Sequence, residues 1–251
     1  MSNKYHNKNI LIIGASFGIG EELCRQLSSF GANLAISARS KDKIVQLSKE
    51  LPGSHLAIPC DVAKRSDLQN LRQELFKKWD KIDIVIFGVG IYQPMNIDNF
   101  DLAKSKDILD VNFSSFLNFV DVFLDDFKGQ NISQLGVISS VAGYFGMPNS
   151  LVYGASKAAL TNLTESLFYE FKKYQVKVQL INPGFVKTRL TDQNNFKMPS
   201  IISAQSASKI IVKNLSSSKF EIKFPLIFTF VMRLLSLLPY QIRFLLFKNV
   251  K

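Results

Sequence analysis

A tyrosine and a lysine lie four residues apart at Tyr153 and Lys157. On a helix this spacing places both side chains on one face, one turn apart. An ammonium group stabilises a neighbouring phenolate, so we expect Lys157 to lower the pKa of Tyr153 from its usual value of about 10. A tyrosine tuned in this way is suited to general acid–base chemistry at a substrate oxygen.

Tyr169 and Lys173 form a second pair with the same spacing, and the position of a serine distinguishes the two pairs. Each tyrosine also follows a serine by thirteen residues. Ser156 lies in the same expected helix as Tyr169, and thirteen helical residues span about 20 Å, so those two side chains cannot share a site. Ser140 instead follows an apolar strand, and a loop containing glycines and a proline returns the chain to Tyr153. We therefore predict that Ser140 joins Tyr153 in a catalytic group.

A glycine-rich loop follows the first expected strand and opens the first expected helix. Its sequence is Gly14-Ala-Ser-Phe-Gly18-Ile-Gly20. Glycine lets the backbone turn tightly and approach a pyrophosphate, while the helix N-terminus supplies N–H donors and a positive dipole. The loop therefore indicates a dinucleotide-binding site, with a purely structural turn as the alternative. The candidate residues here are Gly14, Ser16, Gly18, Ile19 and Gly20.

The second expected strand ends at Ala38-Arg39, where a carboxylate would hydrogen-bond the ribose of NAD. No acidic residue stands there, and Arg39 can pair with a 2′-phosphate. We therefore expect NADP(H) as the cofactor, with NAD(H) less favoured; a solvated surface arginine is the alternative. After the third strand, Asp61-Val62 places a carboxylate within reach of an adenine amino group, and a role for Asp61 as a helix N-cap competes with this one.

Short apolar runs alternate with amphipathic stretches, and these elements must position the residues above. We expect strands at Ile10–Ile13, Asn33–Ala38, His55–Pro59, Ile82–Phe87, Gly136–Ser139 and Lys177–Ile181. We expect helices at Gly18–Phe30, Ser66–Trp79, Asp107–Phe127 and Val152–Tyr174. Continuously apolar strands are typical of parallel sheets buried on both faces. The predicted fold class is α/β, a doubly wound parallel sheet in a three-layer Rossmann fold, which binds ligands at the carboxyl ends of its strands.

Over about residues 8–190 the chain resembles the short-chain dehydrogenase/reductase family. The matching motifs are Gly14-x-x-x-Gly18-Ile-Gly20, Asp61-Val62, Asn112, Ser140, Tyr153-x-x-x-Lys157 and Asn182-Pro183-Gly184 followed by Thr188. They occur in the family's order and near its spacing. The resemblance implies a nicotinamide-dependent oxidoreductase that interconverts a carbonyl and an alcohol.

The resemblance also implies a role for each matched residue. Tyr153 exchanges a proton with the substrate oxygen, and Ser140 hydrogen-bonds that oxygen. Lys157 holds the nicotinamide ribose and lowers the pKa of Tyr153, while Asn112 bends its helix and holds a water in a proton relay. The residues that flank the nicotinamide are Pro183, Gly184 and Thr188.

Two positions differ from the family's pattern. Ile13 stands where threonine is usual, and Phe87-Gly88-Val89-Gly90 replaces the usual Asn-Asn-Ala-Gly after the fourth strand. Both replaced groups are polar links that steady the loop and the central strand. Gly88 and Gly90 remain assigned to the cofactor site.

The 251 residues suit one α/β domain with a full core, which we place at residues 1–218. The net charge of +11 suits a polyanionic cofactor or an anionic membrane, and no zinc-finger spacing, helix-turn-helix or RNP-type motif indicates nucleic acid. Cys24 and Cys60 have neither disulfide nor metal spacing, so we expect buried, reduced thiols and no metal site. The polar segment Met1–Asn9 lacks the apolar stretch of a secretory signal, which favours a cytoplasmic protein.

Residues 219–251 form an apolar, basic C-terminal tail. Its apolar run is interrupted by Arg233 and Pro239, so no stretch covers the thickness of a bilayer. We expect two short amphipathic helices hinged at Pro239. Two interpretations stay open: reversible contact with the inner face of an anionic membrane, or packing over the substrate cleft or a subunit interface.

The segment between Thr188 and Ser203 is expected to cover the substrate. Phe196 and Met198 would line an apolar pocket, with an ordinary surface loop as the alternative. We expect a small carbonyl or alcohol substrate of hydrophobic character, and a homodimer or homotetramer. The alternative function is a non-catalytic dinucleotide-binding sensor or a membrane-surface scaffold, and the complete catalytic set argues against it.

Overall fold

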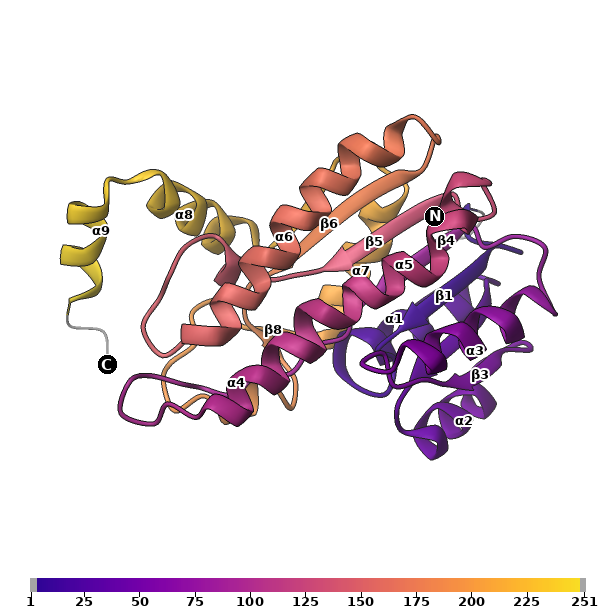
Figure 1. The fold of residues 1–251 in the computed structure, drawn as a ribbon, viewed down its shortest axis with the longest axis horizontal. Helices are drawn as coiled ribbons and strands as arrows, with labels where there is room; N and C mark the ends of the chain where they lie inside the picture. Colours follow the sequence, from indigo (N-terminus) through magenta and orange to yellow (C-terminus); the bar gives the residue numbers. More distant parts are fainter. Residues whose placement is uncertain (1–3, 249–251) are drawn as a thin grey trace.

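A computed structural model describes residues 4–248. In this range seven parallel strands form one sheet, in the order β3-β2-β1-β4-β5-β6-β9 (Figure 1). The strands are β1 (Asn9–Ile13), β2 (Asn33–Ala38), β3 (Leu56–Pro59), β4 (Ile84–Phe87), β5 (Gln134–Ile138), β6 (Lys177–Pro183) and β9 (Glu221–Phe224). The predicted doubly wound Rossmann fold is therefore confirmed.

Helices cover both faces of the sheet, because successive side chains of each buried strand point to opposite faces. Ile10 and Ile12 of β1 belong to one apolar core, and Leu11 and Ile13 belong to the other. The first core is closed by α1 (Gly18–Ser29), α2 (Lys41–Glu50) and α7 (Ala204–Leu215). The second is closed by α3 (Arg65–Phe76), α5 (Ser115–Lys128) and α6 (Leu151–Lys172). The two layers of helices hold the strand ends rigidly.

The six expected strands are present, each within two residues of its expected start and end. Among the strands of the main sheet and the helices that cover it, three elements were not expected from the sequence. Two are the helices α2 and α7, and the third is the strand β9, which pairs with β6 at the edge of the sheet. Because β9 lies inside the segment that we assigned to the tail, the helical part of the tail starts only at Leu226.

The expected helix Asp107–Phe127 is divided into three parts. α4 (Leu102–Leu109) leads into a π-helical turn at Asp110–Ser114, and α5 continues from Ser115. A π turn inserts one extra residue into the helix and changes its direction, and such turns often occur at functional sites. Asn112 lies in this turn, so the bend expected at that residue is present.

Two short elements follow the sheet strand β6. β7 (Val186–Lys187) and β8 (Ile202–Ser203) pair in parallel, and they bring together the ends of the 188–201 segment. The tail then forms α8 (Leu226–Leu237) and α9 (Tyr240–Phe247) on either side of Pro239. Within the described range, no helix is long and apolar enough to span a membrane.

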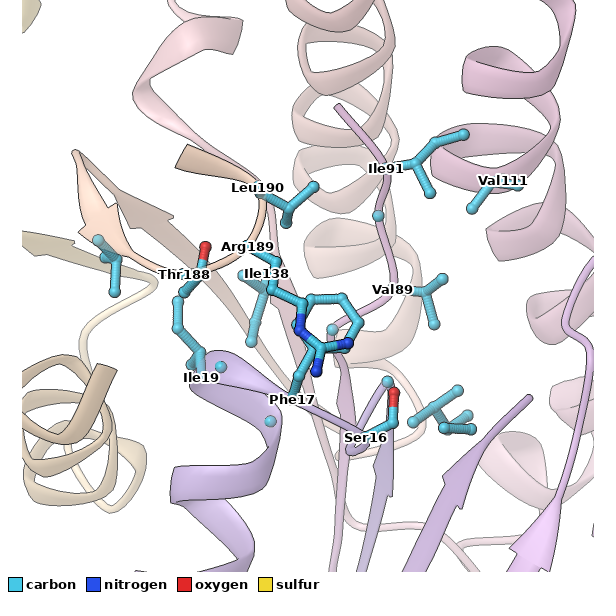
Figure 2. Close-up of a pocket in the computed structure, with 18 of the residues that line it drawn as sticks. Ser16, Phe17, Ile19, Val89, Ile91, Val111, Ile138, Thr188, Arg189 and Leu190 are labelled. Atoms are coloured by element: carbon cyan, nitrogen blue, oxygen red, sulfur yellow. The ribbon is translucent and has the colours of Figure 1, made fainter. Parts of the chain in front are cut away.

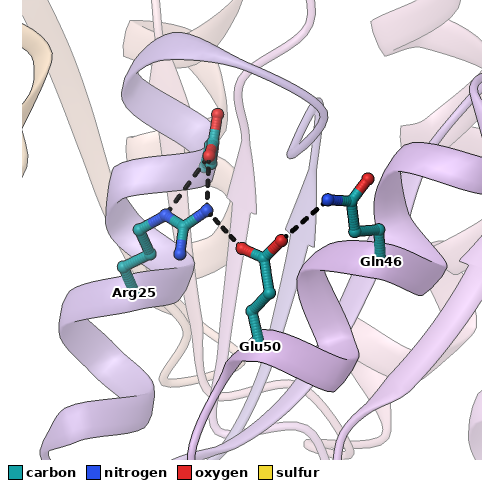
Figure 3. Close-up of polar contacts among 4 residues, drawn as sticks. Arg25, Gln46 and Glu50 are labelled. Atoms are coloured by element: carbon teal, nitrogen blue, oxygen red, sulfur yellow. Dashed lines mark hydrogen bonds and ion pairs between the residues drawn. The ribbon is translucent and has the colours of Figure 1, made fainter.

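A charged network ties α1 to α2 (Figure 3). Arg25 on α1 donates to Glu21 and to Glu50, both at 2.8 Å, and Gln46 donates to Glu50 at 2.9 Å. These side chains are largely exposed, so the network adds little stability. It does fix the position of α2, which follows the end of β2.

Candidate active site

A cleft of about 260 Å³ opens at the carboxyl ends of β1, β4 and β5 (Figure 2). The chain order reverses between β1 and β4, which is where open α/β sheets bind their ligands. The cleft is lined by all the expected catalytic and cofactor-binding residues except Asn112. Its apolar wall is formed by Val89, Ile91, Val111, Ile138 and Leu190.

The floor of the cleft is the glycine loop, and its backbone leaves no room for side chains. Gly14 has a φ of +93°, and a Cβ there would lie 2.6 Å from the carbonyl oxygen of Gly88. A Cβ on Gly20 would collide with the carbonyl oxygen of Gly14. α1 begins at Gly18, and Phe17 before it provides no side-chain cap, so the first N–H groups of the helix are left for a ligand. The loop therefore fits the pyrophosphate of a dinucleotide.

Ser140, Tyr153 and Lys157 meet in the cleft, as the topology predicted. Ser140 lies close enough to Tyr153 that hydrogen bonding between the two side chains acts to lower the pKa of the phenol. Ser140 comes from the end of β5, where its Oγ also accepts a hydrogen bond from the Ala142 N–H at 3.1 Å. Lys157 is buried, and its Nζ lies 5.9 Å from the centre of the Tyr153 ring.

The second Tyr-x-x-x-Lys pair lies away from the cleft. Tyr169 is 73% exposed, and Lys173 forms a surface ion pair with Glu170 at 3.7 Å. Ser156, thirteen residues before Tyr169, is fully buried and is hydrogen-bonded to Asn112. This pair therefore has no site to act in.

The expected effect of Lys157 on the pKa of Tyr153 was wrong for this geometry. Burial raises the pKa of Tyr153 to about 12; the hydrogen bond with Ser140 lowers it, and the neighbouring Tyr92 raises it further. Burial also lowers the pKa of Lys157 to about 8. Loss of water disfavours both charged forms, and no carboxylate pairs with the ammonium, whose only protein acceptor in the described range is the Ile138 carbonyl at 3.3 Å. Tyr153 therefore carries its proton at neutral pH.

Asn112 lies behind the cleft and is fully buried. Its side chain accepts from the Ile91 N–H at 2.7 Å and donates to the Ile91 carbonyl at 3.0 Å. It also donates to Ser156 Oγ at 3.0 Å, and Ser156 in turn donates to the Tyr153 carbonyl at 2.8 Å. The amide thus joins the loop after β4 to the helix that carries the tyrosine.

The loop after β4 passes close to Lys157, which explains its glycines. A Cβ on Gly90 would lie 3.3 Å from Lys157 Nζ and 3.5 Å from Asn112 Oδ1. A Cβ on Gly88 would lie 3.1 Å from the side chain of Ile138. The unusual Phe87-Gly88-Val89-Gly90 sequence therefore keeps the close approach, even though it lacks the family's polar side chains.

Two cations line the end of the cleft that follows β2. Arg39 comes directly after the strand, and Lys43 lies on α2. Arg39 precedes the helix and Lys43 lies in its first turn, and both side chains line the cleft. Lys43 was not identified from the sequence, because the helix that presents it was not expected.

Asp61 and Val62 line the same cleft after β3. Asp61 Oδ1 accepts from the Ala63 N–H at 3.2 Å, whereas the N-cap of α3 is Lys64. The proposed capping role of Asp61 was therefore wrong; the carboxylate shapes the turn before the helix.

The opposite side of the cleft is formed by the segment after β6, with Pro183, Gly184 and Thr188 among the lining residues. Arg189 crosses the cleft, and its guanidinium stacks over the Phe17 ring at 5.7 Å (Figure 2). Leu190 and Thr191 line the cleft, but Phe196 and Met198 do not. Phe196 packs against Phe185 instead, with their ring centres 5.8 Å apart, so its expected place in the pocket was wrong.

A polar cluster supports the site from the edge of the sheet. Glu221 on β9 accepts from Tyr144 and from Asn182, at 2.5 and 2.7 Å. Burial acts to raise the pKa of Glu221, but these two hydrogen bonds and the nearby Lys223 and Arg233 hold it below its usual value. The cluster was not foreseen, because it depends on β9 pairing with β6. It ties the loop after Ser140 to the strand that leads to Pro183.

The chain matches known proteins over most of its length. The family profile described as short chain dehydrogenase matches residues 8–199. An uncharacterized oxidoreductase of Staphylococcus epidermidis is 27% identical over 83% of this chain and 91% of its own. A 3-oxoacyl-[acyl-carrier-protein] reductase of Rickettsia conorii is 32% identical over 78% of this chain and 79% of its own.

Solved structures share the same architecture. A short chain dehydrogenase/reductase from Burkholderia phymatum in complex with NAD has a TM-score of 0.84 and 19% identity, and the match covers 92% of this chain and 93% of that one. A 3-ketoacyl-(acyl-carrier-protein) reductase from Brucella melitensis complexed with NADH has a TM-score of 0.79 and 20% identity, over 88% and 98% of the two chains. With the family match over residues 8–199, the conclusion is that the chain belongs to the short-chain dehydrogenase family of oxidoreductases.

Proposed function

We propose that the protein is an NADP(H)-dependent oxidoreductase that interconverts a carbonyl and an alcohol on a hydrophobic substrate. The observation that carries this proposal is the meeting of the Tyr153 phenol and the Ser140 hydroxyl in the glycine-floored cleft, one helical turn from buried Lys157. A protein that only binds a dinucleotide has no need of this group.

The side chains divide the chemistry between them. When bound, the nicotinamide cofactor supplies the hydride for reduction or accepts it in oxidation. Tyr153 is protonated at neutral pH, so it donates a proton to the carbonyl oxygen during reduction. Ser140 would hold that oxygen beside the phenol, and Lys157 would hold the cofactor's ribose.

The direct test is Tyr153→Phe, which keeps the ring and removes the proton. We expect turnover to fall by at least ~10²-fold, the usual contribution of general acid–base catalysis, while dinucleotide binding persists. Tyr169→Phe is the matched control, since Tyr169 is on the same helix but exposed. Near-normal turnover of Tyr153→Phe on an accepted substrate would refute the mechanism.

We infer a preference for NADP(H) from the cations at the far end of the cleft. Arg39 and Lys43 both line the place where β2 ends, and no carboxylate of β2 is there to bind a ribose hydroxyl. Charge-assisted hydrogen bonds to phosphate are about twice as strong as neutral ones. Titration of both cofactors should show tighter binding of NADPH, and Arg39→Ala should lose at least ~10-fold in NADPH affinity with little change for NADH. Equal losses for both cofactors would refute a role in reading the 2′-phosphate.

The hydrophobic character of the substrate is inferred from the apolar wall of the cleft. Val89, Ile91 and Leu190 face the space next to Tyr153. The relative from Rickettsia conorii is named as a 3-oxoacyl-[acyl-carrier-protein] reductase, which supports a carbonyl on an aliphatic chain. A screen of NADPH consumption across acyl carbonyls, ketones and aldehydes tests this, and a preference for small polar carbonyls would contradict it.

A further inference from the structure

The tail helices present an apolar surface to solvent. Each of eleven large apolar side chains between residues 226 and 246 is at least 45% exposed. They are Leu226, Ile227, Phe230, Val231, Leu234, Leu237, Tyr240, Ile242, Phe244, Leu245 and Leu246, and we call them the tail face. A contiguous apolar surface of this kind is unusual on a protein that stays free in water.

Two polar side chains of the same helices, Thr229 and Arg243, point toward the protein. Thr229 is fully buried, and its hydroxyl donates to the Pro225 carbonyl at 3.0 Å. Arg243 is only 9% exposed, donates to the Ser236 carbonyl at 3.3 Å and lies over the Phe145 ring at 5.1 Å. An ordinary surface helix turns its apolar stripe to the core and its polar stripe to water. At Thr229 and Arg243 this arrangement is reversed while the tail face is exposed, so an apolar partner is needed to cover that face.

Contacts with the body of the protein fix this orientation. Phe228 of α8 packs against Phe185, with ring centres 5.4 Å apart, and a Cβ on Gly184 would lie 2.7 Å from the Phe228 ring. Phe247 of α9 packs against Phe145 with ring centres 5.6 Å apart. Figure 1 shows both helices at one end of the molecule, projecting beyond the sheet. The helices therefore cannot turn over to bury the tail face without losing these contacts.

The charge of the segment identifies the chemistry of the partner. Residues 222–251 contain five Lys or Arg residues and no Asp or Glu. Arg233 on α8 and Lys248, directly after α9, are exposed beside the tail face. A second copy of the chain would bring the same cations against each other, whereas an anionic bilayer offers a hydrocarbon layer under a negative surface.

We propose that α8 and α9 dock the protein on an anionic lipid bilayer, with the tail face in the boundary between headgroups and acyl chains. The helices lie along the membrane and do not cross it, which agrees with their lengths. This interaction is independent of the oxidoreductase reaction, so its test measures binding to the bilayer and not turnover.

The test is cosedimentation of the full chain with mixed phosphatidylcholine–phosphatidylglycerol vesicles and with phosphatidylcholine vesicles. We expect binding to the mixed vesicles at low salt, and at least ~10-fold weaker binding to the neutral ones, because each basic residue near an anionic surface adds roughly five-fold. Added salt should weaken the binding without removing it, since the apolar contribution is not screened.

Substitutions on the tail face locate the contact. Ile227 is 81% exposed and Leu245 is 72% exposed, so the double variant Ile227→Glu/Leu245→Glu should fold normally and bind mixed vesicles at least ~10-fold more weakly. Ile97→Glu is the matched control, because Ile97 is also 81% exposed but lies far along the chain from the tail. It should bind like the unchanged protein.

Three outcomes would overturn the proposal. The first is full-length protein that stays in the supernatant with mixed vesicles at low salt. The second is a double variant that binds as well as the Ile97→Glu control. The third is a double variant that loses a dimer in light scattering while the unchanged chain ignores vesicles, which would assign the tail face to a second copy.

Discussion

The rings of Tyr92 and Tyr153 meet edge to face, with their centres 4.9 Å apart. The Tyr92 hydroxyl donates to Asn194 Oδ1 at 2.8 Å, and Asn194 belongs to the segment that β7 and β8 close. Tyr92 therefore joins Tyr153, the proposed acid–base residue, to the segment expected to cover the substrate.

Removal of the Tyr92 hydroxyl should loosen that segment without moving the ring. For Tyr92→Phe we expect KM to rise several-fold, with a small change in kcat, because a neutral hydrogen bond is worth about 1 kcal/mol. Asn194→Ala should raise KM at least as much, because it also removes the hydrogen bond of the Asn194 amide to Met198 Sδ, and the double variant should add little to Asn194→Ala. Steady-state kinetics of the three variants tests this prediction. Additive increases in KM would show that Tyr92 and Asn194 do not act through their shared hydrogen bond.

The buried Lys157 should make the stability of the protein depend on pH. Its pKa falls from 10.5 to about 8 on folding, so between these values the unfolded chain binds more protons and stability rises with pH. Below pH 8 the full cost of burying the ammonium is present, on the order of 3 kcal/mol.

Lys157→Met removes this cost and should be more stable than the unchanged protein below pH 8, although it loses activity. Its advantage should shrink as pH rises from 8 to 10.5, and urea unfolding across that range measures it. Tyr153→Phe keeps the lysine and should show the unchanged rise. A constant difference between Lys157→Met and the unchanged chain would mean that Lys157 is not desolvated.

Glu221→Gln should weaken the cluster that joins the loop after Ser140 to β6. The substitution keeps the shape but removes the charge, and hydrogen bonds to charged groups contribute about 1.5–3 kcal/mol. Because the group is partly exposed, we expect a loss of about 1 kcal/mol at neutral pH.

The sign of the pH effect follows from the lowered pKa of Glu221. Its contribution is fully present above the unfolded pKa of about 4.5 and is lost as pH falls through the lower folded value. The free energies of unfolding of Glu221→Gln and of the unchanged protein should therefore converge at low pH. Glu170→Gln, at an exposed ion pair, is the control and should be silent. A loss that persists unchanged at low pH would show that the charge of Glu221 is not what matters.

The sequence predicted the position of the site better than its electrostatics. The order of strands brings Gly14, Ser140 and Tyr153 together at the carboxyl ends of the strands. That arrangement follows from periodicity and topology alone. The spacing of Tyr153 and Lys157 is also a local property of a helix. The pKa values depend instead on how much water each group loses, which is set by packing from β4 and β5.

Three features of the structure depend on contacts between distant parts of the chain. The strand β9 has only four residues, Glu221–Phe224, and becomes recognisable through its pairing with β6. The π turn at Asn112 does not change the apolar pattern of its helix. The orientation of α8 is decided by the contact of Phe228 with Gly184, which no local pattern of residues indicates.

The position of β9 has a consequence for how such a chain can be extended. A parallel strand at the sheet edge leaves at the same end as its neighbours, so the chain departs at Phe224 beside Pro183. Any segment added after this strand is delivered to the rim of the cleft, and not to the opposite end of the molecule. A lineage can thus acquire a new surface next to its reaction centre by lengthening one terminus, with the ancestral sheet left unaltered.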